Sequence, residues 1–254
     1  MRTRLCLFVL FFITFSSFAE PVFELFPVQD SVCTLTGAVL EISSLKYPRP
    51  ERNSYSKDDI NSFDRKFMHS YDFNLDVFGW VVISALAAEQ ITLNFTAERE
   101  EWKQVLVMSL ETILINDGIK NYIKRTVGRE RPYTYYENSP SRIDPNESFV
   151  SGHAMNGFAI ASFSTYVYSQ LYPESNAKWL VGLSSFTLAG ITSLSRIPAG
   201  CHFPSDIACG AVFGSTVGFL VPYLHRRAAL KSESSRKEPV ISLLPDRITV
   251  CIRL

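Results

Sequence analysis

The sequence carries no net charge, because 25 Lys and Arg residues balance 25 Asp and Glu residues. Charged residues make up only 20% of the 254-residue chain. Without an excess of positive charge the chain has no general attraction for nucleic acid, so we expect no nucleic-acid partner, and any anion site must be local. Internal repeats and low-complexity tracts are also missing, and 12 Gly with 13 Pro are too few for a collagen-like or linker protein.

Cysteine is scarce and has no metal-binding spacing. There is no Cys-x-x-Cys, and Cys201-His202 is the only close Cys/His pair, so we expect no zinc site and no other metal. One cysteine falls in the leader and four remain, with three possible disulfide connectivities or none: Cys6 in the leader, then Cys33, Cys201, Cys209 and Cys251. Free buried thiols fit the sequence as well as disulfides do.

Apolar side chains are abundant, at 46% of the chain, and this figure includes the aromatic residues, which make up 13% of the chain. Such a composition excludes intrinsic disorder. They gather in five long stretches of roughly 17 to 19 residues, which favours helices over strands. The stretches are 77–93, 105–123, 154–172, 179–195 and 207–224. The sequence therefore predicts an all-α bundle of five to six core helices.

The same lengths suit helices that span a membrane. The last three stretches contain no charged residue, whereas the second contains Glu111, Asp117 and Lys120, which would need inward-facing partners. If residues 20–75 lie outside the cytoplasm, the basic residues after the fifth helix fall inside, as expected, but the basic loop after the second falls outside. The membrane-spanning bundle is favoured, and a soluble periplasmic bundle remains the alternative.

Both chain ends differ from this core. Residues 1–19 have a basic start, an apolar run from Leu5 to Phe15 and small residues before position 20, which indicates a secretory signal peptide cleaved after Ala19 or an uncleaved anchor. Residues 20–75 are expected to be an extracytoplasmic, irregular lead-in with one or two short helices, in which Asp64-Arg65 is a surface pair. Residues 76–225 form the helical core, and 226–254 form a basic tail with a possible hairpin around Pro245-Asp246.

Three loops between the apolar stretches hold an unusual set of polar residues. The first runs from Lys124 to Pro132, and four of its nine residues are basic. Taken alone, such a loop can also be a lipid headgroup contact or a marker of membrane topology. The second loop places Ser151, Gly152 and His153 at the start of a helix, where free backbone N–H groups can hold an anion. A serine in this position is also an ordinary helix cap.

The third loop contains Ser195-Arg196 and then His202 and Asp206, near the start of the fifth apolar stretch. Pro204 fits the first turn of a helix, so His202 and Asp206 lie about one turn apart. An Asp there can accept a hydrogen bond from one imidazole nitrogen and leave the other free to attack. Taken alone, this fragment is better explained by a capping histidine bound to a structural Asp. Together the three loops offer three cations, two histidines and a helix start, which suit a phosphoryl dianion.

In these residues the chain resembles the type 2 phosphatidic acid phosphatase superfamily, which includes bacterial acid phosphatases and vanadium haloperoxidases. The family signature is Lys-x6-Arg-Pro, Pro-Ser-Gly-His and Ser-Arg-x5-His-x3-Asp. This chain matches it in order and spacing, with Lys124 to Arg131, with 151–153, and with 195–206. One residue departs from the pattern, because Val150 stands where the family usually has Pro. The resemblance covers about residues 76–224.

The resemblance implies a role for each matched residue. His202 would be the nucleophile that forms a phosphohistidine, Asp206 would orient it, and His153 would act as general acid and base. Three cations, one hydroxyl and one backbone N–H would hold the phosphoryl oxygens: Lys124, Arg131, Arg196, Ser151 and Gly152. No metal and no cofactor is implied.

The sequence therefore predicts a metal-independent phosphatase that acts on phosphomonoesters. Lipid phosphates or polyprenyl pyrophosphates are the favoured substrates, and the expected place is a bacterial inner membrane with the site facing the periplasm. The alternatives are a soluble periplasmic acid phosphatase of broad specificity and, less favoured, a vanadium-dependent haloperoxidase. A non-enzymatic envelope protein that only binds phosphate is a further alternative. The sequence does not indicate an oligomeric state.

Overall fold

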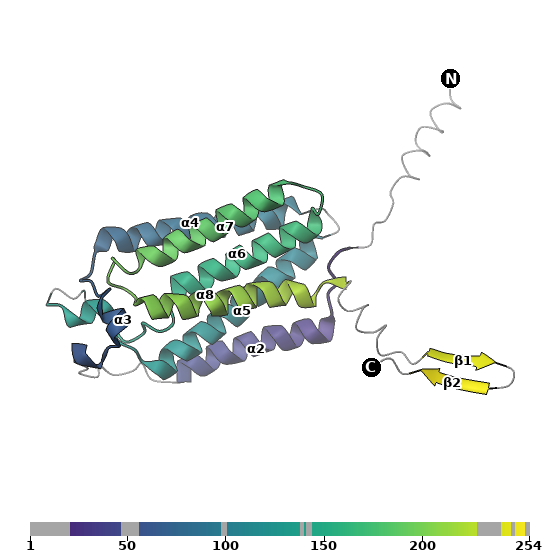
Figure 1. Cartoon of the computed structure of the whole chain (residues 1–254), viewed down its shortest axis with the longest axis horizontal. Coiled ribbons are helices and arrows are strands. Elements are labelled where there is room, and N and C mark those ends of the chain that lie inside the picture. The colour runs from purple at the N-terminus through teal and green to yellow at the C-terminus, as the bar shows by residue number, and fades with distance from the viewer. Residues whose placement is uncertain are drawn as a thin grey trace, which may run out of the picture.

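The computed structural model describes residues 21–46, 56–97, 101–137, 140, 144–227, 240–244 and 247–251. Within these residues, six long helices form an elongated bundle (Figure 1). They are α2 (Pro27–Lys46), α4 (Phe73–Thr96), α5 (Trp102–Val127), α6 (Gly152–Leu171), α7 (Ala177–Ser195) and α8 (Pro204–Leu224). Short helical turns lie at one end: η1 (Lys57–Asp59), α3 (Ser62–Arg65) and η2 (Pro132–Tyr135). The predicted all-α bundle is confirmed.

Each of the five apolar stretches forms a helix, and the helices extend beyond the stretches because polar residues start or stop them. Asp72 begins α4, since its side chain accepts a hydrogen bond from the Leu75 backbone N–H. Pro204 occupies the first turn of α8, where its missing N–H costs nothing. Gly128 ends α5 in the left-handed conformation, with φ of 63°.

The lead-in differs from its prediction, because it contains α2, a helix of 20 residues rather than short irregular pieces. This helix packs along α5, and its backbone approaches closely where two glycines cross. A Cβ at Gly37 would lie 2.7 Å from the Leu114 carbonyl carbon, and one at Gly118 would lie 2.6 Å from the Gly37 oxygen. The extracytoplasmic placement of this segment stays a prediction.

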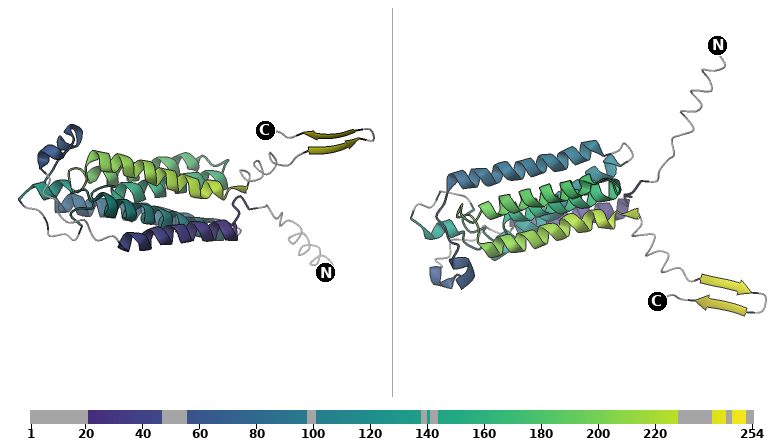
Figure 2. Two further views of the ribbon diagram at one scale, coloured as in Figure 1. Left: turned by 90° about the horizontal axis from the view of Figure 1, so that it is seen from below. Right: turned by 45° about the horizontal axis from the view of Figure 1, so that its top comes forward.

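Helix α6 is central, since it packs against α4, α5, α7 and α8 (Figures 1 and 2). Its contact with α8 is the closest, because a row of glycines on α8 lets the two backbones approach. A Cβ at Gly214 would lie 2.1 Å from the Met155 carbonyl oxygen, and one at Gly218 would lie equally close to the Ala159 oxygen. Small residues spaced by four allow this kind of helix crossing.

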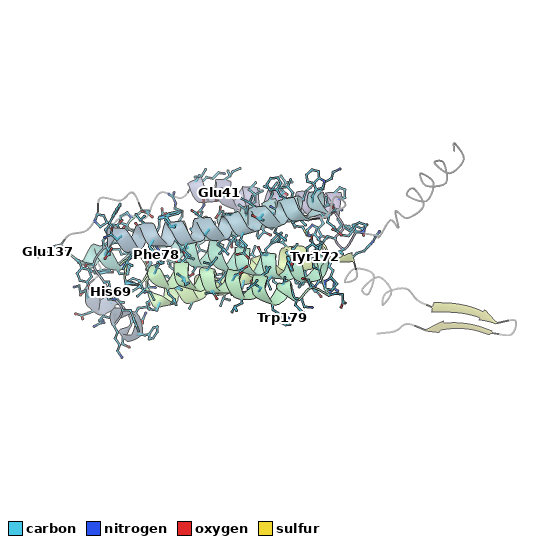
Figure 3. All side chains as sticks on the ribbon, turned by 90° about the horizontal axis from the view of Figure 1, so that it is seen from above. Glu41, His69, Phe78, Glu137, Tyr172 and Trp179 are labelled. Atoms are coloured by element: carbon cyan, nitrogen blue, oxygen red, sulfur yellow. The ribbon has the colours of Figure 1, made fainter. Side chains whose placement is uncertain are left out.

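The helix directions bring particular ends together. Helices α4, α6 and α8 begin, and α5 and α7 end, at the end of the bundle that carries α3, which we call the pocket end (Figure 1). Helix α2 runs in the same direction as α5, so it begins at the opposite end, which we call the far end. Figure 3 shows the pocket end beside His69 and Glu137 and the far end beside Tyr172.

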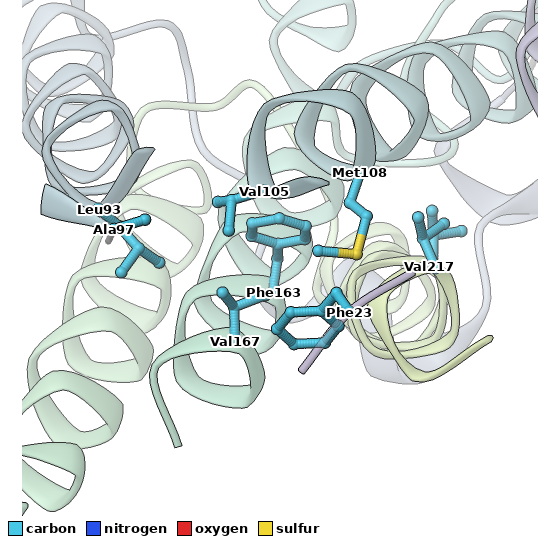
Figure 4. Packing of buried hydrophobic residues seen from close by; sticks show 9 residues of the cluster. Phe23, Leu93, Ala97, Val105, Met108, Phe163, Val167 and Val217 are labelled. Carbon is cyan, nitrogen blue, oxygen red and sulfur yellow. The ribbon is translucent and has the colours of Figure 1, made fainter. Parts of the chain in front are cut away.

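A cluster of buried side chains at the far end joins the segment before α2 to the bundle (Figure 4). Phe23 is fully buried against residues of α5, α6 and α8, including Met108 and Phe163. Burial of one such side chain contributes about 1.5–3 kcal/mol. The chain ends of the bundle also meet here, since the Glu24 N–H donates to the His225 carbonyl oxygen at 2.9 Å.

In the tail, β1 (Val240–Leu244) and β2 (Arg247–Cys251) pair as antiparallel strands. Their register places Val240 opposite Cys251. The predicted signal peptide or anchor at 1–19 lies outside the described residues. Among the described cysteines, Cys33 and Cys209 are unpaired thiols.

Candidate active site

A cavity of about 220 Å³ lies near the pocket end, between α4, α5, α6 and the loop before α8. Six of the eight predicted site residues line it, which are Lys124, Arg131, Gly152, His153, Arg196 and His202. The other lining residues are Trp80, Ile83, Lys120, Asn121, Asp144, Glu147 and Asn156. Segments far apart in the sequence therefore converge on one space, as the three-loop prediction required.

The His202 imidazole is buried and has a defined orientation. Its Nε2 lies 3.1 Å from Nη1 of Arg131. A guanidinium can only donate, so Nε2 carries the lone pair and the proton belongs on Nδ1. Burial, and then the positive charges of Arg131 and Lys124, hold the pKa of His202 well below its ordinary value. The imidazole is therefore neutral, and its Nε2 lone pair, which accepts from Arg131, is on the side of the ring that lines the cavity.

Asp206 lies behind His202 and does not line the cavity. Its Oδ2 is 3.6 Å from Nδ1 of His202, longer than a hydrogen bond, so it faces the imidazole without binding it closely. The same oxygen accepts from the Ser148 hydroxyl at 2.6 Å and from the Phe203 N–H at 2.9 Å. The predicted orienting carboxylate is thus itself fixed by α8 and by the loop before α6.

Arg129 connects this carboxylate to a second one. Its Nη1 lies 2.5 Å from Asp206 Oδ1, and its Nη2 lies 2.7 Å from Asp64 Oδ2. The guanidinium also sits over the Phe203 ring, with its carbon 4.1 Å from the ring centroid. Arg129 therefore holds the start of α8 and the short helix α3 in one network.

The predicted surface pair Asp64-Arg65 is wrong. Asp64 is fully buried and accepts hydrogen bonds from Arg129 and from Ser205, whereas Arg65 pairs with Asp58. Burial raises the pKa of Asp64, but the hydrogen bonds from Arg129, Ser205 and Asn61 outweigh it and hold the pKa below its ordinary value. Adjacent opposite charges in the sequence indicated a pair, but the short helix turns the two side chains to different partners.

Two of the predicted phosphate-binding cations are held by acceptors of the loop before α6. Arg131 donates through Nε and Nη2 to Asp144, and its Nη1 also reaches the Cys201 carbonyl oxygen. Lys124 donates through Nζ to the Glu147 carbonyl oxygen at 2.7 Å. Burial, and then the charge of Arg131, lower the pKa of Lys124 to about 7.

The third cation, Arg196, is almost completely buried and pairs with α4. Its Nη1 donates to the Asp76 carbonyl oxygen at 3.0 Å, and its Nη2 pairs with the Asp76 carboxylate. Gly79 makes room for this guanidinium, since a Cβ there would lie 2.7 Å from Nη1. Among the described residues, Nε of Arg196 has no hydrogen-bond partner, so this donor is available to a ligand.

His153 also lines the cavity and comes from the first turn of α6. Its ring meets the Trp80 ring edge-on, with centroids 4.5 Å apart and planes at 72°. Its Nε2 has no hydrogen-bond partner among the described residues. Burial, and then the charge of Arg196, lower the pKa of His153 to about 3, so its imidazole is neutral.

The structure separates the two predicted residues at the start of α6. Gly152 lines the cavity, so its N–H belongs to a helix N-terminus that faces the anion site. Ser151 is fully buried, caps α6 by accepting from the Ala154 N–H at 3.4 Å, and is not among the lining residues. The cap that the sequence left as an alternative for Ser151 is therefore present.

The cavity offers fixed positive charge, a helix N-terminus and two neutral imidazoles to one anion. This arrangement fits a phosphoryl group, whose charge is spread over several oxygens. A profile of the PAP2 superfamily matches residues 105–229. The chain belongs to the PAP2 superfamily. The resemblance stated from the three-part signature is confirmed.

Several curated PAP2 relatives are similar over part of their length. The chain is 29% identical over 127 residues to a lipid A 1-phosphatase of Porphyromonas gingivalis, covering 50% of this chain and 25% of that one. It is 28% identical over 153 residues to a decaprenylphosphoryl-5-phosphoribose phosphatase of Mycobacterium tuberculosis, covering 59% and 73%. A phosphatidylglycerophosphatase B of Bacillus subtilis is 28% identical over 126 residues, covering 48% and 58%. The chain thus spans a quarter to about half of the first relatives that it matches.

Among solved structures, a transmembrane PAP2-type phosphatidylglycerolphosphate phosphatase from Bacillus subtilis is similar. Its TM-score is 0.43 at 19% identity, covering 92% of this chain and 98% of that one.

The carboxylates that pair with Arg196 and Arg131 were not identified from the sequence. Asp76 is a first-turn residue of α4, and Asp144 lies in an irregular loop, so neither has a local pattern that points to its partner. Arg129 was visible as part of the basic loop, but its spacing did not distinguish it from a cation that faces the ligand.

Proposed function

We propose that this protein is a phosphatase that cleaves phosphomonoesters through a phosphohistidine at His202. The observation that carries the proposal is the convergence of three cations and two neutral histidines on one cavity. In this mechanism fixed cations stabilise the phosphoryl charge, and the mechanism uses no metal.

In the first step, Nε2 of His202 attacks phosphorus with its lone pair, and the bond from phosphorus to the leaving oxygen breaks. The proton on Nδ1 faces Asp206, whose charge stabilises the imidazole as it gains positive charge. The leaving oxygen takes a proton from His153, which also lines the cavity. Arg131, already 3.1 Å from Nε2, stands where it can bind a phosphoryl oxygen during the attack.

In the second step, water attacks the phosphohistidine. His153, now neutral, accepts a proton from the water, the P–N bond breaks, and its electron pair returns to Nε2 of His202. Inorganic phosphate is the product, and the nucleophile is restored with Nδ1 still protonated.

His153 must be protonated for the first step, although burial and then Arg196 lower its pKa to about 3 in the protein alone. Burial and the nearby Arg196 cause this low value, so the arrival of a phosphate dianion works in the opposite direction. The negative charge of the substrate therefore raises the pKa of His153, and this residue can then hold the proton that it donates as general acid.

We propose lipid-linked phosphates as the substrate class, because an apolar groove continues from the cavity. The groove has a volume of about 320 Å³, lies between α4, α5 and α6, and shares Asn156 with the cavity. A further hollow of about 360 Å³ shares Ile91 and Leu106 with the groove and continues it toward the far end. A hydrocarbon chain can lie in such a groove while its phosphate reaches His202.

The outer surface of the bundle also fits a lipid surrounding. Within the described residues, Phe73–Phe95 and Pro204–Leu224 have the length and composition of membrane spans. Large apolar side chains on α4 and α7 are exposed, among them Phe95, Trp179 and Leu183. We propose that the five stretches predicted from the sequence cross the membrane and that the pocket faces the periplasm. The relatives named as lipid phosphatases support this substrate class.

The test is hydrolysis of lipid phosphates by the full chain in detergent, with phosphate release as the readout. We expect wild type to be active, His202→Ala to lose activity by at least about a thousandfold, and vanadate to inhibit. With a substrate whose leaving group needs no proton, such as p-nitrophenyl phosphate, a labelled phosphate should remain covalently bound to His153→Ala, since this variant lacks the base for the second step. An active His202→Ala variant contradicts the proposal.

The groove is tested by filling it. Leu110 lines the groove and is partly exposed, so Leu110→Trp should raise KM for a long-chain lipid phosphate and leave a short water-soluble phosphomonoester unaffected. Leu183→Trp on the exposed surface of α7 is the matched control. Equal effects of Leu110→Trp on both substrates would argue for a broad-specificity phosphatase.

A further inference from the structure

Three side chains that can bind a metal converge at the far end of the bundle, away from the cavity near the pocket end. They come from three helices: Asp30 from the first turn of α2, Glu111 from α5, and His225 from the end of α8. Nε2 of His225 lies 2.9 Å from Asp30 Oδ1 and 3.4 Å from Glu111 Oε2. One ligand atom from each residue lies within 4.8 Å of the other two.

The tautomer of His225 follows from its second nitrogen. Nδ1 lies 2.7 Å from the Val221 carbonyl oxygen, which can only accept, so Nδ1 carries a proton. In the neutral imidazole Nε2 then has a lone pair that is directed at two carboxylates. Histidine ligands of metals are commonly fixed in this way, with the other ring nitrogen bound to a backbone carbonyl.

Glu111 gives an independent indication. Its side chain is 1% exposed, and among the described residues neither carboxylate oxygen has a hydrogen-bond partner. A buried carboxylate without hydrogen bonds is costly unless a cation compensates it. Within the described residues, the donor that faces the carboxylates of Asp30 and Glu111 is His225 itself when its imidazole is protonated, and with a neutral imidazole all three groups direct lone pairs into one space.

We propose that Asp30, Glu111 and His225 form a binding site for a divalent transition-metal cation, of which Zn²⁺ is the best fit. One imidazole nitrogen with two carboxylate oxygens suits Zn²⁺, whereas Ca²⁺ and Mg²⁺ prefer oxygen ligands throughout. Asp30 is partly exposed, so the ion has access from solvent. Cys33 lies about one helical turn after Asp30 and is an unpaired thiol that could complete the coordination.

The site would act on the bundle rather than on the reaction. It would tie the start of α2 and the end of α8 to α5, beside the Phe23 cluster that closes the far end. A metal that binds only the folded chain stabilises it by mass action. This inference does not rest on the proposed phosphatase activity.

The test uses the full chain without a histidine tag, stripped by a chelator and then titrated with Zn²⁺. We expect one bound Zn²⁺ per chain by elemental analysis. The thermal midpoint should rise by roughly 5 °C or more at a Zn²⁺ concentration about 100 times the dissociation constant. The absence of bound Zn²⁺ would overturn the proposal.

The variants locate the ion. Glu111→Gln and Asp30→Asn should each weaken Zn²⁺ binding by at least about tenfold, because each removes a charged ligand. Glu24→Gln is the matched control, since Glu24 lies at the same end and pairs with Arg227. Zn²⁺ affinities of both variants equal to wild type would place the ion elsewhere and overturn the proposal. Because the readouts are binding and stability, failure here leaves the phosphatase proposal untouched.

Discussion

Lys124 is the cation of the pocket whose charge changes with pH. Its pKa is lowered to about 7 by burial and then by Arg131, so Lys124 is mostly an ammonium below pH 7 and mostly a neutral amine above it. A neutral amine binds a phosphoryl group less well, so kcat/KM should fall as the pH rises through about 7. The pH profile of kcat/KM reports groups of the free enzyme and is the measurement that checks this.

Lys124→Arg is the diagnostic variant for this pH dependence. A guanidinium stays protonated under all these conditions, so the variant should lose the decline above pH 7 even if its activity is lower. A decline at the same pH in Lys124→Arg would assign it to another group.

Arg129 is a positioning residue, since it holds Asp206 and Asp64 without lining the cavity. Arg129→Gln should lower kcat by about 10- to 100-fold, because Asp206 and the start of α8 lose their anchor, and should change KM little. Arg129→Lys should restore only part of the activity, because an ammonium cannot bind both carboxylates in the same geometry.

The control for Arg129 is Arg65→Gln, which removes a partly exposed guanidinium paired with Asp58. This variant should keep the wild-type kcat, since surface pairs contribute little. If Arg129→Gln lowers the thermal midpoint but keeps the wild-type kcat, the result contradicts a positioning role for Arg129.

At the scale of the helices, the contact between α6 and α8 depends on the absence of side chains. Gly214→Ala would place a methyl group 2.1 Å from the Met155 carbonyl oxygen, so the two helices must separate. We expect a lower thermal midpoint, by several degrees, and a loss of activity because α6 carries His153 and α8 follows His202. Thermal unfolding in detergent measures the first effect.

Gly190→Ala is the matched helical control, because a Cβ there meets nothing within 4 Å. Alanine favours a helix over glycine by up to about 1 kcal/mol, so this variant should be as stable as wild type or slightly more stable. Equal destabilisation by both substitutions would mean that the close α6–α8 contact does not matter.

The helices were predictable from the sequence where their apolar residues are continuous. The five stretches gave five of the six long helices, because uncharged runs of this length have few other structures open to them. Helix α2 was missed, since Asp30 and Glu41 interrupt it and apolar residues such as Val32 and Leu35 lie on its exposed side. A one-sided pattern in a polar context gives a weaker signal than a continuous run.

The residues that line the cavity were predictable for a different reason, because the order and spacing of six of them belong to a signature. Their partners were not, since Asp76 is 120 residues from Arg196 in the chain and Asp64 is 65 residues from Arg129. Such pairs arise only when the bundle closes. Local spacing therefore identified His202 and Arg131 and gave no information on what holds them.

At the scale of the whole molecule, the direction of α2 links two predictions that were made separately. If α2 crosses the membrane beside α5, its start at Pro27 and the pocket lie on opposite faces of the bilayer. A cleaved signal at 1–19 would leave residue 20 outside the cytoplasm. A periplasmic pocket in a spanning bundle therefore requires that residues 1–19 are not removed as a signal.

Cysteine labelling tests the side that the pocket faces. Glu137 is exposed at the pocket end and Glu174 is exposed near the far end, so each can be replaced by Cys in a chain whose own cysteines are Ser. With a periplasmic pocket, an impermeant maleimide should label Glu137→Cys in intact cells and not Glu174→Cys, and the intact mass should include residues 1–19. The reverse labelling places the pocket in the cytoplasm, and labelling of both in a chain shortened by cleavage indicates a soluble periplasmic bundle.

The pairing of Arg196 with Asp76 means that the region matched by the family profile does not contain every residue that holds the site together. Residues 105–229 match the superfamily and contain all eight predicted site residues. Asp76 and Trp80 on α4, and Asp64 before it, lie outside that region and yet hold or border the site. Two members of the family can thus share every signature residue and still differ in how their cations are held. Transfer of an activity from a relative to this chain therefore has to be tested at α3 and α4 as well as in the three signature loops.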